Sequence, residues 1–160
     1  STFEGSFLAI RPVNTLSHYT DWTVGHVHSG TLGWVAMIVF GAIYTLVPRL
    51  WGREDMAWPR AVEWHFWLSI GGTLIYVVAL WNAGITQALM WRAYEENGAL
   101  SYSFIESVEA MLPYYAVRTL GGGLFLAGVV LCALNCRATM RAAGDRRDAA
   151  DRPISAQPAE

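Results

Sequence analysis

Two histidines, His26 and His28, begin a long apolar stretch, "DWTVGHVHSGTLGWVAMIVFGAIY". Imidazole binds metals and forms hydrogen bonds, and it is costly inside hydrocarbon unless it has a partner. Side chains two residues apart on a helix differ by about 200° and therefore point to opposite sides. The two imidazoles cannot chelate one metal ion together, so each needs its own partner on its own flank of the helix.

Two kinds of partner would meet this need. Each imidazole could form a hydrogen bond to a neighbouring helix, or each could bind a separate metal centre. The burial of each has to be compensated separately, and haem iron takes a neutral imidazole as an axial ligand. We therefore favour two haems, one on each flank of this helix, over two hydrogen-bonded core histidines.

Three apolar runs, at residues 23–48, 64–91 and 114–136, are long enough to cross a bilayer as helices, which takes roughly 20 residues. The chain has 160 residues, of which 54% are hydrophobic and 15% charged, as in membrane proteins. We expect Asp21 and Thr23 to cap the first run, Pro48 to stop it, and Pro113 to separate a short amphipathic piece from the third.

The sequence thus predicts an all-α integral membrane protein with three transmembrane helices plus the end of a fourth, within a larger helical bundle. We expect residues 1–22 to form the end of that truncated helix and an outer loop. Residues 23–143 would hold the three transmembrane helices, and residues 144–160, rich in Asp, Arg, Ala and Pro, would form a disordered cytoplasmic tail.

The arginines predict the orientation. The connection "PRLWGREDMAWPR" has three arginines and the tail has five, whereas "RAYEENGALSYSFIESVEA" has one arginine and four glutamates. By the positive-inside rule, the first connection and the tail are cytoplasmic, so His26 and His28 lie toward the outer face. His65, at the opposite end, is expected at the membrane interface. The net charge of −2 gives no indication of nucleic-acid binding.

Glycines recur in these runs. "GGG" at 121–123 is typical of close helix–helix packing. Gly25, Gly30 and Gly33 permit the same interpretation, but they would also leave room for flat ligands beside the two histidines.

Several motifs resemble one family. "HVHSGTLGWVAMIVFGAIYTLVPRLWGRE" resembles the helix of haem–copper oxidases that ligates both haems of the catalytic subunit, subunit I. "TFEG", "VNTLSHYTDWTVGHVHSG", "GITQALMWRA" and "SYSFIES" extend the resemblance to the cbb-type cytochrome c oxidases, over residues 1 to about 140. This implies a bacterial inner-membrane enzyme that reduces oxygen to water, coupled to proton translocation, with a low-spin haem b, a high-spin haem b and copper.

The resemblance also implies residue roles. His26 matches the proximal ligand of the high-spin haem, and His28 matches an axial ligand of the low-spin haem. Glu4 matches a carboxylate that accepts a hydrogen bond from Nδ1–H of the proximal histidine, which makes the imidazole more electron-donating. The alternative for Glu4 is a surface-facing residue at a helix end.

Five further residues match or suit positions near haem propionates. Asn14, His18 and Asp21 match positions that surround the propionates of the high-spin haem in this family. Arg92 and Arg118 lie at the outer ends of their apolar runs, where a propionate would be a suitable anion. The alternatives are a solvated loop histidine at position 18 and arginines that snorkel to the interface.

The copper ligands and the second axial ligand of the low-spin haem have no candidates in this sequence. We therefore expect a C-terminal fragment or one piece of a split subunit, inactive alone, with copper bound by residues outside this chain. Expected partners are the remainder of the catalytic subunit, cytochrome c-type accessory subunits, cytochrome c and oxygen. A nitric oxide reductase relative with iron in place of copper, and a non-catalytic membrane haem-binding or assembly protein, are the alternatives.

Overall fold

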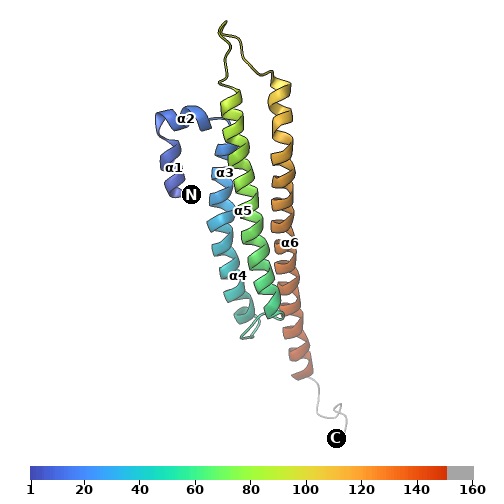
Figure 1. Cartoon of the computed structure of the whole chain (residues 1–160). Coiled ribbons are helices and arrows are strands. Elements are labelled where there is room, and N and C mark those ends of the chain that lie inside the picture. The colour runs from blue at the N-terminus through green and yellow to red at the C-terminus, as the bar shows by residue number, and fades with distance from the viewer. Residues whose placement is uncertain (151–160) are drawn as a thin grey trace.

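The computed structural model describes residues 1–150, and its regular elements in that range are helices. In chain order they are α1 (Thr2–Leu8), α2 (Arg11–Ser17), α3 (Asp21–His28), the π-helix η1 (Ser29–Val35), α4 (Ala36–Leu50), α5 (Pro59–Met90) and α6 (Phe104–Ala150). The elements α3, η1 and α4 follow one another without a break and form one long rod (Figure 1). The predicted all-α class is confirmed.

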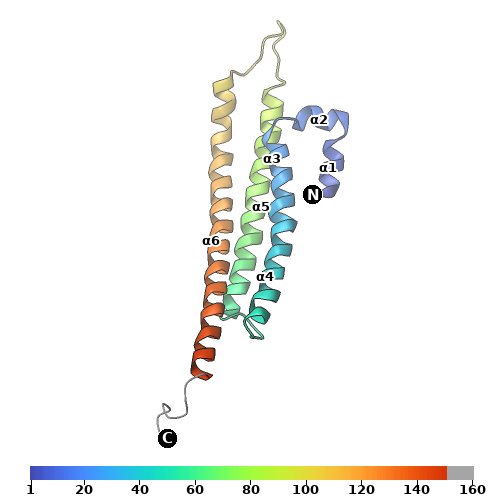
Figure 2. The same ribbon diagram turned by 180° about the vertical axis from the view of Figure 1, so that it is seen from behind.

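Three long helical rods lie side by side, with α5 between the α3–α4 rod and α6 (Figures 1 and 2). The helix α5 packs against α6 along much of its length and against α3 near its C-terminal end. The segments Asp21–Leu50, Pro59–Met90 and Phe104–Gly144 are long and apolar enough to cross a membrane, which confirms the three predicted spans. The short helices α1 and α2 fold back beside α3, toward the end where α5 joins α6 (Figure 1).

The first span begins and ends differently from the prediction. Thr20 caps α3, because its Oγ1 accepts a hydrogen bond from the backbone N–H of Trp22 at 3.3 Å. Asp21 is the first residue of the helix, and Thr23 donates its hydroxyl back to the carbonyl of Thr20. Pro48 lies inside the last turn of α4, which continues for two more residues.

The expected break at Pro113 is wrong, because α6 runs through it. A reciprocal capping box starts this helix upstream: the N–H of Ser103 donates to Glu106 Oε2 at 2.7 Å, and the N–H of Glu106 donates to Ser103 Oγ at 3.3 Å. Proline inside membrane helices is tolerated when neighbouring groups satisfy the freed carbonyl. At its other end α6 continues to Ala150, through a run rich in the helix formers Ala and Arg. The predicted tail therefore begins as helix, and residues 151–160 lie outside those described.

Glycines let α5 and α6 approach to backbone contact. A Cβ on Gly72 would lie 2.7 Å from the carbonyl oxygen of Gly121, and a Cβ on Gly121 would lie 2.6 Å from the backbone nitrogen of Tyr76. A Cβ on Gly128 would lie 2.9 Å from Ser69 Oγ. The packing role expected for the glycine run is thus confirmed at Gly121.

Candidate functional site

His26 meets Glu4 where α1 folds back beside α3. Glu4 Oε2 lies 3.2 Å from His26 Nδ1, and the two side chains are 16% and 26% exposed. An ionised carboxylate only accepts hydrogen bonds, so His26 Nδ1 donates. This fixes the tautomer and leaves the lone pair on Nε2 free for a metal.

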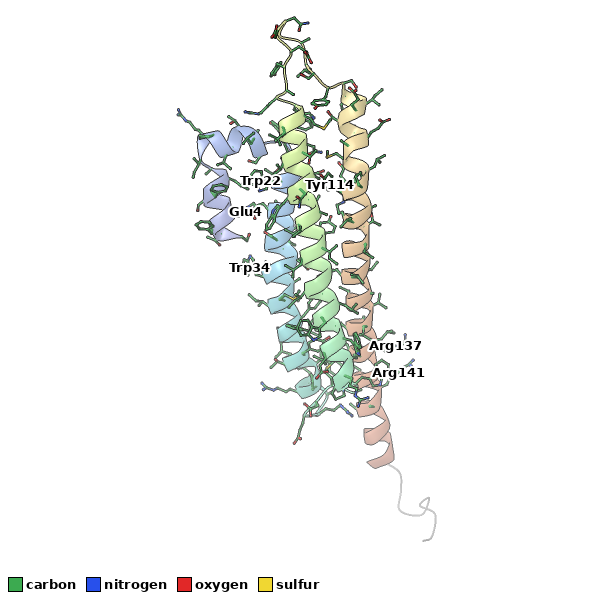
Figure 3. The ribbon with its side chains drawn as sticks, viewed as in Figure 1. Glu4, Trp22, Trp34, Tyr114, Arg137 and Arg141 are labelled. Atoms are coloured by element: carbon green, nitrogen blue, oxygen red, sulfur yellow. The ribbon has the colours of Figure 1, made fainter. Side chains whose placement is uncertain are left out.

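A second donor from α3 completes the surroundings of Glu4. Trp22 Nε1 donates to Glu4 Oε1 at 3.1 Å (Figure 3). Trp22 and His26 are four residues apart, so they lie one turn apart on the same face of α3 and reach the two oxygens of one carboxylate. Sequence reasoning missed Trp22, although this i, i+4 spacing toward His26 was a usable signal.

His28 has different neighbours. Its Nδ1 lies 2.8 Å from the backbone carbonyl oxygen of Val24, one turn earlier. Its ring packs against Tyr76 of α5, with the ring centroids 4.9 Å apart. A carbonyl can only accept, so Nδ1 again carries the proton and Nε2 keeps its lone pair. His26 thus faces α1 while His28 faces α5, as the helical geometry requires.

Gly5 of α1 lies beside the Nε2 edge of the His26 ring. A Cβ on Gly5 would lie 3.3 Å from both Nε2 and Cε1 of His26. The missing side chain therefore lets the backbone of α1 lie close to this edge of the ring. The two imidazoles, each with a proton on Nδ1 and a lone pair on Nε2, fit axial binding to haem iron. A groove of about 380 Å³ lies beside Glu4, between α1, α3 and α5.

The glycines of the first span have different surroundings. A Cβ on Gly25 would lie 2.9 Å from Cδ1 of Trp81, so this glycine serves the packing of α3 on α5. A Cβ on Gly30 would lie 3.0 Å from Ser1 Oγ, and Gly33 has nothing within 4 Å. The helix widens into the π-helix η1 directly after His28, a feature that is frequent at functional sites and that the sequence pattern did not indicate.

Two of the proposed propionate residues shape the outer loop. Asn14 Nδ2 donates to the backbone carbonyl of Leu8 at 3.2 Å. The ring of His18, which is exposed, lies against the ring of Tyr19 with centroids 4.0 Å apart. The structure brings neither side chain into hydrogen-bond contact with His26.

Asp21 joins the outer loop to α5. Its backbone N–H donates to Gln87 Oε1 at 2.7 Å, and Gln87 Nε2 donates back to its carboxylate at 3.2 Å. Sequence reasoning missed Gln87, which is buried on α5. One turn earlier, Gly84 touches the backbone of Trp22, so the start of α3 lies directly on α5.

The two arginines have separate partners. Arg92, just after α5, donates to the backbone carbonyl of Thr15 in α2. The guanidinium of Arg118 lies over the ring of Tyr115, 4.8 Å from its centroid, in a cation–π arrangement. Neither contact uses a carboxylate.

His65 lies inside the helix bundle, near the beginning of α5. It is 2% exposed, and its Nδ1 lies 2.7 Å from the hydroxyl of Tyr44 on α4. It faces inward because it belongs to the buried stripe of α5 that includes Ala61, Ser69 and Gly72. Within residues 1–144, no three His, Cys, Asp or Glu side chains come together in a way that could hold a metal ion.

The segment that holds Glu4 and both histidines lies in the part of the chain that matches a known protein family. The family model for "Cytochrome C and Quinol oxidase polypeptide I" matches residues 1–124. The chain belongs to this family. The resemblance to the catalytic subunit of the cbb-type oxidases is confirmed by similarity to individual members.

Three relatives show how the chain stands within the family. It is 52% identical over 160 residues, its full length, to the "Cytochrome c oxidase subunit 1 homolog, bacteroid" of Bradyrhizobium diazoefficiens, of which it covers 29%. It is 53% identical over 143 residues, 89% of its length, to the "Cbb3-type cytochrome c oxidase subunit CcoN1" of Stutzerimonas stutzeri, covering 30%. It is 30% identical over 79% of its length to a nitric oxide reductase polypeptide of the same organism, covering 27%. The chain thus spans less than a third of the length of these relatives.

Proposed function

We propose that this chain supplies the axial histidines for two haems in the catalytic subunit of a cbb-type cytochrome c oxidase. The observation that carries the proposal is the pair of imidazoles on α3. Each donates Nδ1–H to an oxygen, each keeps its Nε2 lone pair, and the two face different neighbours. His26 binds the high-spin haem b, and His28 binds the low-spin haem b.

The haems, when bound, supply one-electron transfer and the iron at which oxygen is reduced. The contribution of this chain is to hold the imidazoles. The carbonyl of Val24 orients His28, and the carboxylate of Glu4 orients His26 and makes its ring more electron-donating. One rigid helix fixes the distance between the two ligands, so both haem sites are set by the same short stretch of backbone.

The outer loop would then lie near the haem edges. Arg118 and Arg92 would supply cations for propionates, and Asp21, Asn14 and His18 would complete the polar surroundings. In support, Asp21 and Arg92 join the loop to α5 at the end of the bundle where α1 meets α3.

The complete subunit would take electrons from cytochrome c through cytochrome c-type accessory subunits and would reduce oxygen to water with proton translocation. Copper and the second ligand of the low-spin haem would come from residues outside this chain. The arginine-rich α4–α5 connection and the C-terminal tail would face the cytoplasm of a bacterial inner membrane. The identities of 52% and 53% to the oxidase relatives, against 30% to the nitric oxide reductase relative, favour the oxidase.

The test is the haem content and the oxygen uptake of the complete subunit with His26→Leu or His28→Leu. Each substitution is expected to remove one haem per complex and to abolish oxygen uptake with cytochrome c as donor. Val27→Leu, between the two histidines and on neither flank, is the matched control and should retain both haems. Two haems retained in both histidine variants would contradict the proposal.

A further inference from the structure

The carboxylate of Glu4 is held at both of its oxygens from one face of α3. Trp22 donates to Oε1 at 3.1 Å, and His26 donates to Oε2 at 3.2 Å. The hydroxyl of Ser29 lies 3.5 Å from Oε2, but it donates to the backbone carbonyl of His26 at 2.7 Å. The indole and the imidazole are therefore the two donors that define how this carboxylate is turned.

Trp22 is itself fixed by contacts that do not involve Glu4. Its backbone touches Gly84 of α5, where a Cβ would collide with it. The backbone N–H of Trp22 donates to the capping hydroxyl of Thr20. The indole ring lies against the ring of Phe7 of α1, with the centroids 6.4 Å apart. The indole N–H is thus a well-anchored donor, because the backbone of Trp22 lies on α5 and its ring lies against Phe7.

Glu4 by contrast is a flexible side chain on a seven-residue helix. A glutamate has three rotatable bonds, and ordering it costs conformational entropy. With only the imidazole as partner, the carboxylate would rotate about its terminal bond. The hydrogen bond from Nδ1–H of His26 to Oε2 would then be less well aligned. The second, well-anchored donor removes this freedom.

We propose that Trp22 is a positioning residue whose indole N–H turns the Glu4 carboxylate so that Oε2 faces Nδ1 of His26. This rests on the proposed function, in which His26 ligates the high-spin haem. Through this contact Trp22 sets how strongly the imidazole donates electrons to the iron, by way of the Glu4 carboxylate.

The test uses the complete haem-loaded subunit with Trp22 replaced by 3-benzothienylalanine, in which sulfur takes the place of N–H and the shape is kept. Trp22→Phe is the second variant. The readout is the iron–histidine stretching frequency from resonance Raman spectra of the reduced high-spin haem. Both variants are expected to shift this frequency downward and to broaden the band, by less than Glu4→Gln does.

Trp81→Phe is the matched control. Trp81 lines the same groove, and its Nε1 has no hydrogen-bond partner among the described residues, so its removal should leave the frequency unchanged. A frequency that stays constant or rises in the Trp22 variants, or that falls equally in the Trp81 variant, would overturn the proposal.

A second measurement separates failure of this inference from failure of the proposed function. The ultraviolet resonance Raman marker of indole N–H hydrogen bonding does not depend on haem. Glu4→Gln should shift it toward a weaker hydrogen bond, and the shift should be absent when Trp22 is already replaced. If His26→Leu leaves the iron–histidine band in place, the ligand assignment is wrong. If the band responds to His26 and Glu4 but not to Trp22, only the inference about Trp22 is wrong.

Discussion

The α5–α6 interface and the α1–α3 contact are held together in opposite ways. Between α5 and α6 the backbones nearly touch, through Gly72 and Gly121, and the seam has no room for an added methyl group. Between α1 and α3 the contact is polar, made by Glu4 with Trp22 and His26, and a groove lies beside it.

This difference separates the scaffold from the site. Close-packed glycines stabilise through many short contacts that any added side chain disrupts. A polar contact beside open space adds less to stability, but it fixes the direction of specific hydrogen bonds. Substitutions in the seam should therefore act on folding, whereas substitutions at the α1–α3 contact should act on the properties of a bound group.

The largest effect is expected for Gly121→Val. The new side chain would enter the space of the Tyr76 backbone nitrogen and the Gly72 carbonyl, both within 2.7 Å of the added Cβ. Forcing backbones apart costs about 3 kcal/mol or more. Thermal unfolding in detergent should show the loss, and Gly123→Val, which has nothing within 4 Å of its Cβ, should unfold close to the unmodified protein.

A smaller loss is expected for Asn135→Leu. Asn135 is fully buried on α6, accepts from the N–H of Trp58 at 2.9 Å and donates to the Trp58 carbonyl at 3.0 Å. Leaving both backbone groups without partners costs about 2–4 kcal/mol. The measurement is the same unfolding curve, with Asn82→Leu as the control, because Asn82 is exposed and donates only to the carbonyl of Val78 in its own helix. Equal curves for the two variants would show that the buried contact adds nothing.

Tyr44→Phe sharpens the comparison at a histidine outside the proposed site. Removing the hydroxyl deprives the imidazole of His65 of its only hydrogen bond among the described residues and costs about 1–2 kcal/mol. Haem content should not change. Tyr19→Phe, at an 85% exposed tyrosine, is the control for loss of a hydroxyl. Loss of a haem in Tyr44→Phe would show that this region is not purely structural.

Glu4→Gln is expected to have the smallest effect on stability, below about 1 kcal/mol, because the amide still accepts a hydrogen bond. It should nevertheless raise the midpoint potential of the high-spin haem, since a neutral amide makes the imidazole less electron-donating. A shift on the order of 60 mV corresponds to a tenfold change in a one-electron equilibrium. Glu109→Gln, at an exposed position on α6, is the charge control for the redox titration. An unchanged potential in Glu4→Gln would refute the pairing.

Local patterns were enough for much of the fold. Uninterrupted apolar runs predicted the three spans. The two-residue separation of His26 and His28 predicted that they face different neighbours. The predicted break at Pro113 is wrong because a membrane helix tolerates an internal proline and because the Ser103–Glu106 capping box starts α6 upstream of it.

The sequence predicted only some of the residues of the candidate site. A family resemblance predicts Glu4 beside His26. The i, i+4 spacing places Trp22 on the same face of α3 as His26, but its contact with Glu4 also depends on the way α1 and α2 fold back. Gln87 binds Asp21 across 66 residues of sequence, a pairing that only the packing of α3 on α5 creates. The inward orientation of His65 depends on which face of α5 it occupies, and its position near a helix end does not indicate that face.

The most direct test of the central claim separates the two haem signals of the complete subunit by magnetic circular dichroism. If each histidine serves its own flank, His26→Leu removes the high-spin signal and keeps the low-spin one, and His28→Leu does the reverse. If both substitutions affect the same signal, or if both signals survive both substitutions, the assignment of two haems to opposite faces of α3 is contradicted.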